Sequence, residues 1–265
     1  MSGARRRRLP GLSVGRLIPN ALTLLALCAG ATAIRLALTE RWELAVAAVG
    51  VAMLLDALDG RIARLMKATS RFGAELDSLA DVVNFGLTPA LMVYLWALGD
   101  TGGLGWALAL VYVICCALRL ARFNTANLSD RNALPWAEKF FTGVPAPAAA
   151  GLALLPMVMS FELQGEILSS APVNGAMLIL VAALMVSEVP TFSAKRLRLP
   201  HDYVGLALIG VGAFAAFLVS TPWVTLSVLG LAYLGSIPLS MRSYLRLKAL
   251  AKATGEAELT PSKDD

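Results

Sequence analysis

Eight apolar runs, each about as long as a membrane-spanning helix, constrain the fold of this chain more than any other feature. A helix needs about 20 residues to cross a hydrocarbon core of about 30 Å. Hydrophobic residues make up 57% of the 265 residues and charged residues 15%, a balance outside the soluble globular class. We therefore expect an all-α integral membrane protein with eight transmembrane helices, at residues 17–38, 43–65, 76–98, 104–122, 143–161, 173–192, 203–220 and 223–241.

Positive charge is unevenly distributed between the predicted loops. If the amino terminus is cytoplasmic, only Arg35 and Arg41 of the 23 Lys and Arg residues fall at outer ends and outer loops. The positive-inside rule describes this bias, so we expect both termini on the cytoplasmic side of the inner (cytoplasmic) membrane. The predicted parts are a basic cytoplasmic segment over 1–16, a multi-pass transmembrane domain over 17–241, and a cytoplasmic, partly disordered tail over 242–265. The net charge of +5 then reflects lipid headgroups, and no nucleic-acid partner is expected.

Four aspartates stand at the cytoplasmic ends of the second and third predicted spans. Asp56 and Asp59 are three residues apart and share one helix stripe, and Asp77 and Asp81 are one helical turn apart. The short connection over 65–74 makes the two helices antiparallel neighbours, so the two pairs can meet. An Asp at a helix centre costs about 2.5–3.5 kcal/mol on insertion scales, less near the interface. Four anions in one pocket also repel one another. The negative charge of this cluster therefore has to be balanced by positive charge.

Two divalent cations would neutralise the four carboxylates. Oxygen ligands with no His or Cys nearby favour Mg²⁺, Mn²⁺ or Ca²⁺ over zinc or copper. Two such ions a few ångströms apart form the usual clamp for in-line displacement at phosphorus. The neighbouring residues fit a phosphate substrate. Gly60, Ala63 and Gly73 let a flat base or ribose approach the backbone, and Arg64 can face a diphosphate with its planar guanidinium.

Two interpretations from other functional classes compete with this one. Asp56 and Asp59 alone would also suit a proton or cation relay in a transporter, a common use of carboxylates inside membranes. A purely structural membrane protein would leave the four aspartates unexplained. The second aspartate pair and the interleaved glycines favour an enzyme.

The order of these residues resembles the signature of the CDP-alcohol phosphotransferases, integral membrane enzymes of phospholipid synthesis. The pattern D-x-x-D-G-x-x-A-R, then eight residues, then G-x-x-x-D-x-x-x-D is matched without a gap over 56–81. The resemblance implies that family's type of helical bundle, with its site at the cytoplasmic side. It implies two divalent cations, Mg²⁺ or Mn²⁺, held by Asp56, Asp59, Asp77 and Asp81.

The same resemblance implies roles in substrate binding and proton transfer. The nucleotide of a CDP-linked lipid would lie along Gly60, Ala63, Arg64 and Gly73. Asp81 would take the proton from the attacking alcohol, a role that suits a carboxylate within hydrogen-bond reach of a weakly acidic hydroxyl. The residues themselves do not separate a base from a pure metal ligand at this position.

Further stretches indicate the acceptor alcohol. They look like parts of bacterial phosphatidylserine synthases of the integral-membrane type: "LDSLADVVNFGLTPA" (76–90), "LRLARFN" (118–124), "TGVPAPAAAG" (142–151) and "VSEVPTFSAKR" (186–196). The expected reaction is transfer of the phosphatidyl group from CDP-diacylglycerol to L-serine, giving phosphatidylserine and CMP. The family often forms homodimers. The last two predicted spans carry no recognisable motif.

Serine needs recognition of its carboxylate and its ammonium group. Arg119 and Arg122 can share a helix face, and a guanidinium suits a carboxylate; Asn124, Asn84 and Lys195 are further candidates. The two arginines could instead extend to the cytoplasmic membrane–water interface or bind a lipid phosphate. Asn84 could instead make an interhelical hydrogen bond. A family member that uses glycerol 3-phosphate or an inositol phosphate as acceptor stays an alternative. Because such an acceptor carries a phosphate, its pocket would need more positively charged groups.

Overall fold

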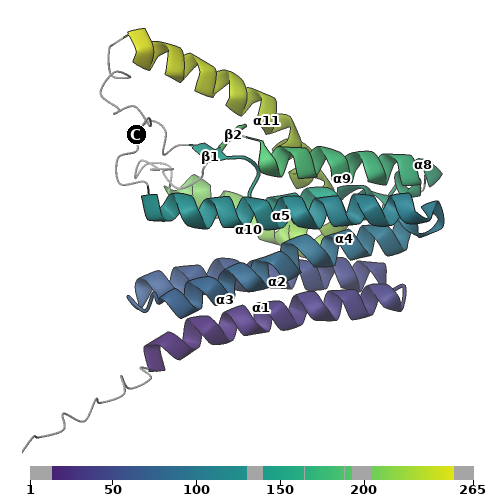
Figure 1. Ribbon diagram of the computed structural model, residues 1–265, viewed down its shortest axis with the longest axis horizontal. Coiled ribbons are helices and arrows are strands. Elements are labelled where there is room, and N and C mark those ends of the chain that lie inside the picture. The colour runs from purple at the N-terminus through teal and green to yellow at the C-terminus, as the bar shows by residue number, and fades with distance from the viewer. Residues whose placement is uncertain (1–13, 130–139, 164, 188, 193–203, 254–265) are drawn as a thin grey trace, which may run out of the picture. The chain divides into compact units, whose positions relative to one another are not determined.

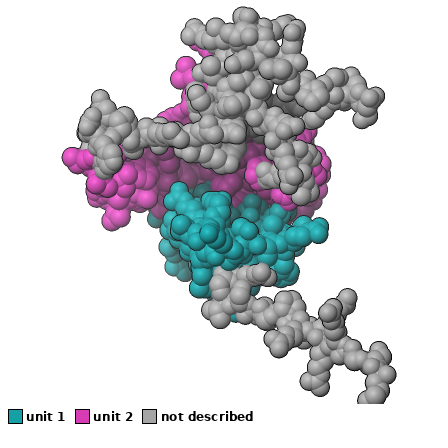
Figure 2. All heavy atoms as spheres, turned by 90° about the vertical axis from the view of Figure 1, so that its left-hand side faces the viewer, with its two compact units in different colours: residues 1–84 teal, residues 85–265 magenta. Residues whose placement is uncertain are grey.

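The computed structural model describes residues 14–129, 140–163, 165–187, 189–192 and 204–253. The chain forms two compact units, residues 1–84 and 85–265, and each is described by itself (Figure 2). The described part of the chain is almost entirely helical, as expected. Its strands are β1 (Phe140–Thr142) and β2 (Pro190–Phe192), a short antiparallel pair that the sequence did not predict.

The helices confirm a membrane protein. Four of the described helical segments are long and apolar enough to cross a bilayer: Leu17–Leu38, Arg71–Thr101, Gly103–Thr125 and Pro222–Arg242. Two shorter apolar helices cover Ala171–Val186 and Ala207–Ser220. The predicted number of eight spans stays a prediction, as does the single transmembrane domain over 17–241.

The first unit contains three packed helices, α1 (Val14–Leu38), α2 (Trp42–Leu65) and α3 (Arg71–Asp81) (Figure 1). The helix α1 contacts both of the others. Alanines lie fully buried in this unit, Ala33 on α1 and Ala45 on α2 among them. Small side chains let two helix backbones approach closely where there is no hydrophobic driving force from water.

The connection between α2 and α3 fixes where the aspartate pairs lie. Lys67 adopts a left-handed conformation with φ 49°, and the Ala68 amide donates to the Ala63 carbonyl at 2.9 Å, which ends α2 in a Schellman-type turn. Ser70 then caps α3 by accepting a hydrogen bond from the Gly73 amide at 3.0 Å. Because of this cap, the third helix begins at Arg71, before the predicted start at 76.

The third helical segment changes its winding directly after Asp81. A π-helical stretch, η1 (Val82–Leu87), follows α3, and the segment continues as α4 (Thr88–Val93), η2 (Tyr94–Leu98) and η3 (Gly99–Thr101). Stretches of π-helix are rare and frequently accompany functional sites. The segment therefore stays helical over 71–101, a longer range than the predicted span.

The helices of the second unit pack around a core of large apolar side chains that includes Met92, Tyr112, Leu178 and Met185. Two of them, α5 and α9, lie side by side (Figure 1). Its remaining helices after α4 are α5 (Gly103–Ser129), α6 (Ala146–Ala153), α7 (Leu155–Ser160), α8 (Glu166–Ser169), α9 (Ala171–Val186), α10 (Val204–Ser220) and α11 (Pro222–Ala253).

Several predicted span ends differ from the helices of the second unit. The predicted span 143–161 is interrupted at Leu154, because Pro156 lacks an amide hydrogen and its ring clashes with the preceding turn. Within the predicted span 173–192, the helix ends at Val186, and residues Pro190–Phe192 form β2. The helices α5 and α11 run past the predicted ends at 122 and 241, because no proline or glycine follows there to stop them.

Candidate active site

The first unit brings the aspartates of α2 and α3 together. One carboxylate oxygen from each of Asp56, Asp59 and Asp77 lies within 4.8 Å of the other two. Asp81 lies within hydrogen-bonding reach of Asp56. The predicted meeting of the two pairs therefore occurs in the structure, through the short α2–α3 connection.

The side chains of the aspartate cluster fit divalent cations as ligands. They offer carboxylate oxygens, the ligands that Mg²⁺ and Mn²⁺ prefer. Asp59 is buried, and Oδ1 of Asp81 is buried without a hydrogen-bond partner among the described residues. A buried, unsatisfied carboxylate oxygen is costly unless a proton donor or a cation meets it. A cation bound beside these aspartates would meet this need.

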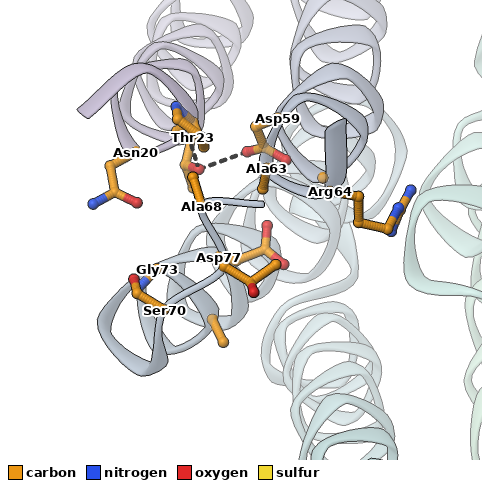
Figure 3. A pocket seen from close by; sticks show the side chains of 13 residues that line it. Asn20, Thr23, Asp59, Ala63, Arg64, Ala68, Ser70, Gly73 and Asp77 are labelled. Atoms are coloured by element: carbon orange, nitrogen blue, oxygen red, sulfur yellow. Dashed lines mark hydrogen bonds between the residues drawn. The ribbon is translucent and has the colours of Figure 1, made fainter. Parts of the chain in front are cut away.

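A cavity of about 180 Å³ opens beside Asp59 and Asp77 (Figure 3). It is bounded by all three helices of the first unit and by the α2–α3 connection. The lining residues are Pro19, Asn20, Thr23, Asp59, Gly60, Ala63, Arg64, Ala68, Thr69, Ser70, Gly73, Ala74 and Asp77. All four positions predicted to contact a nucleotide are among them.

The two glycines of the cavity wall differ in the space around them. Among the described residues, a Cβ added at Gly60 would come within 4 Å of Nη1 of Arg64 alone, at 3.9 Å, and Gly60 lines the cavity. At Gly73 an added Cβ would lie 3.0 Å from Oδ1 of Asn20 and 3.2 Å from Oγ of Ser70. A side chain at Gly73 would therefore need small shifts of the Asn20 and Ser70 side chains.

The wall contributed by α1 was missed by the sequence analysis. Thr23 Oγ1 donates a hydrogen bond to Asp59 Oδ2 at 2.6 Å, drawn dashed in Figure 3. Asn20 and Pro19 border the same cavity. The available signal was the pair of polar residues, Asn20 and Thr23, three positions apart near the start of an apolar span.

The candidate acceptor residues fall in different parts of the chain. Asn84, at the end of the first unit, is 1% exposed; its Oδ1 has no hydrogen-bond partner in the described part of the chain and packs against Gly30. Arg119, Arg122 and Asn124 all lie on α5 in the second unit. Lys195 lies outside the described residues.

The two arginines are near the carboxyl end of α9 within the second unit. Arg122 Nη1 donates to the Val186 carbonyl oxygen at 2.9 Å. Arg119 Nη1 would lie 3.2 Å from a Cβ added at Gly143. A guanidinium beside the last carbonyls of a helix stabilises the helix end. An arginine carries five N–H donors, so one bond to a carbonyl leaves room for a carboxylate.

These features, a helical membrane fold with a compact cluster of aspartates beside a glycine-lined cavity, agree with the family comparison. The model of the CDP-alcohol phosphatidyltransferase family matches residues 16–189. The chain therefore belongs to the CDP-alcohol phosphatidyltransferase family, and the resemblance seen in its sequence is confirmed. A second family model, described as CDP-alcohol phosphatidyltransferase 2, matches residues 202–238. It covers α10 and part of α11, where the sequence analysis found no motif.

The chain is also similar to curated proteins that share one enzyme name. A protein of Mycobacterium tuberculosis (strain ATCC 25618 / H37Rv), a CDP-diacylglycerol–serine O-phosphatidyltransferase, is 40% identical over 235 residues, covering 86% of this chain and 79% of that protein. The enzyme with the same name from Mycobacterium leprae (strain TN) is 35% identical over 252 residues, covering 95% and 82%. That from Helicobacter pylori (strain ATCC 700392 / 26695) is 36% identical over 183 residues, covering 69% and 74%.

Proposed function

We propose that this chain transfers the phosphatidyl group of CDP-diacylglycerol to L-serine, giving phosphatidylserine and CMP. The observation that carries the proposal is the cluster of Asp56, Asp59 and Asp77 beside a cavity lined by the positions that the family resemblance assigns to the nucleotide. The relatives described above are named for serine as acceptor, which supports L-serine over glycerol 3-phosphate or an inositol phosphate.

The reaction is one displacement at the phosphorus that carries the diacylglycerol. The serine hydroxyl oxygen forms a bond to this phosphorus, and the bond to the bridging oxygen breaks, so that CMP leaves with that oxygen. Asp81 accepts the hydroxyl proton. Its buried Oδ1, which lacks a hydrogen-bond partner in the described residues, supports this role. A positioned general base typically contributes about 10²–10⁴-fold in rate.

Asp56, Asp59, Asp77 and Asp81 are proposed to hold two divalent cations, Mg²⁺ or Mn²⁺. Bound there, the cations would stabilise negative charge on the phosphoryl oxygens and on departing CMP. The aspartates in turn fix the place of the reacting phosphorus relative to Asp81. Both metals prefer the same oxygen donors.

Gly60, Ala63, Arg64 and Gly73 are proposed to bind the CDP moiety. Gly60 and Ala63 are on α2 and present little side-chain bulk, so the base and ribose can approach the helix backbone. Arg64 follows one turn after Gly60, and its guanidinium can pair with a diphosphate oxygen.

Arg119, Arg122, Asn124, Asn84 and Lys195 are kept as the proposed acceptor set. Arg119 and Arg122 would meet the serine carboxylate, and the amide of Asn124 would add a donor or an acceptor. Asn84 also packs against Gly30.

The membrane arrangement is proposed to have eight spans, with both termini cytoplasmic and the active site at the cytoplasmic side of the inner membrane. The uneven distribution of Lys and Arg supports it. Water-soluble serine and CMP would then exchange with the cytoplasm while the acyl chains stay in the bilayer. A homodimer is proposed on the family resemblance alone.

The test is CMP release by the purified protein in mixed micelles containing CDP-diacylglycerol and Mn²⁺ or Mg²⁺. L-serine, glycerol 3-phosphate and inositol phosphate are offered separately. We expect CMP release with L-serine and none above background with the phosphorylated alcohols. Release with a phosphorylated alcohol alone would refute the serine assignment and keep the phosphotransferase site. Ion flux across vesicles without CMP release would favour a transporter.

A further inference from the structure

One buried hydrogen bond connects α1 to the aspartate cluster. Thr23 Oγ1 donates to Asp59 Oδ2 at 2.6 Å (Figure 3). Thr23 is 5% exposed and Asp59 is 4% exposed, so water does not compete freely for either group. The length lies in the range of about 2.5–2.7 Å typical of an O–H donating to an anionic oxygen.

The hydroxyl of Thr23 has a choice of two acceptors. A threonine hydroxyl carries one proton, and the Pro19 carbonyl oxygen on the preceding turn lies 3.1 Å from Oγ1. The shorter distance and the negative charge of the carboxylate favour donation to Asp59. This bond restricts rotation of the Asp59 carboxylate, one oxygen of which lies within 4.8 Å of oxygens of Asp56 and Asp77.

We propose that Thr23 is a positioning residue, which holds the Asp59 carboxylate in the orientation needed to ligate a divalent cation. The inference rests on the metal role proposed above for Asp59. Partners that orient a metal ligand commonly change metal affinity by about 10–100-fold when removed. Because Thr23 and Asn20 both border the cavity, α1 then contributes to the metal site and to the nucleotide wall at once.

The chain offers a matched control on the same helix. Thr32 Oγ1 donates to the Cys28 carbonyl oxygen at 2.7 Å, four residues earlier, which is the position that the Pro19 carbonyl has relative to Thr23. Thr32 is exposed. Thr23→Val and Thr32→Val both remove a hydroxyl that lies near a carbonyl oxygen four residues earlier on α1. Only Thr23→Val also removes the bond to the carboxylate of Asp59. Thr23→Ser restores the hydroxyl.

The experiment measures Mn²⁺ binding to the purified full chain in detergent by electron paramagnetic resonance, with no substrate present. We expect Mn²⁺ affinity to fall by about 10-fold or more in Thr23→Val and to stay at the wild-type level in Thr23→Ser and Thr32→Val. Thr23→Ala serves as a second variant if the valine does not fold, which thermal unfolding without metal will show.

Two results would overturn the proposal. One is wild-type Mn²⁺ affinity in Thr23→Val or Thr23→Ala, and the other is an equal loss in Thr32→Val. The phosphatidyltransfer itself is checked separately by CMP release from the wild-type chain. If the wild-type chain binds Mn²⁺ and releases no CMP, the proposed function fails while the positioning role of Thr23 stands. If it binds no Mn²⁺, the positioning role fails.

Discussion

An alanine at Gly60 is expected to stabilise the fold and impair the enzyme. In the described part of the chain, an added Cβ would have Nη1 of Arg64, at 3.9 Å, as its one neighbour within 4 Å, so these residues do not resist the methyl group. Replacing a glycine inside a helix by alanine typically stabilises it by about 0.5–1 kcal/mol. The same methyl would project toward the cavity that is proposed to hold the CDP moiety.

The size of the functional loss follows from one methyl group in a fitted pocket. Such a change is worth about 1–3 kcal/mol, or about 10–200-fold. We therefore expect kcat/KM for CDP-diacylglycerol to fall by about this factor in Gly60→Ala. The melting temperature in detergent should rise or stay unchanged. CMP release at varied CDP-diacylglycerol and saturating serine measures the first quantity, and thermal unfolding measures the second.

Gly50 provides the matched control, because it lies on the same helix and an added Cβ there would meet none of the residues that the structure describes within 4 Å. Gly50→Ala should raise stability similarly and leave kcat/KM unchanged. Wild-type kinetics in Gly60→Ala would refute the placement of the nucleotide beside this position. A lower melting temperature in Gly60→Ala would show that the glycine is needed for folding rather than for binding.

Three further predictions test packing and acceptor recognition. Gly143→Ala should destabilise the protein by at least about 1–2 kcal/mol, since φ is +75° and two carbonyl oxygens lie 2.8 Å from an added Cβ; an unchanged melting temperature contradicts this. Gly30→Ala should lower the melting temperature by colliding with Asn84, and Asn84→Ala in the same chain should restore part of it; additive losses argue against the contact. Arg122→Gln should raise KM for serine and not for CDP-diacylglycerol; unchanged KM with lower stability limits Arg122 to holding the carbonyl of Val186.

The aspartate cluster could be predicted from sequence because its geometry is local. Asp56 and Asp59 share a stripe of one helix, and a short connection to the next helix places Asp77 beside them. Helical periodicity and loop length together determine such a meeting. The start of the third helix was predicted too late because hydropathy does not register the capping role of Ser70.

The contribution of α1 to the site could not be derived in the same way. Thr23 is separated from Asp59 by a whole helical hairpin, and its contact depends on the rotation of α1 about its own axis. Rotation of a membrane helix is set by packing against its neighbours, and hydropathy carries little information on it. The tight space at Gly143 likewise depends on another helix end, because an added Cβ would lie 2.8 Å from the carbonyl oxygens of Met185 and Ser187.

The central claim is that the aspartate cluster transfers a phosphatidyl group to serine, and product formation tests it most directly. Labelled L-serine is incubated with CDP-diacylglycerol micelles, Mn²⁺ and the purified chain, and label is counted in the lipid fraction. We expect labelled phosphatidylserine from the wild type and from Asp100→Asn, a control at an exposed aspartate of the same helical segment. Asp81→Asn should lose at least about 10²–10⁴-fold. Wild-type product formation by Asp81→Asn, or lipid without label from the wild type, would contradict the account.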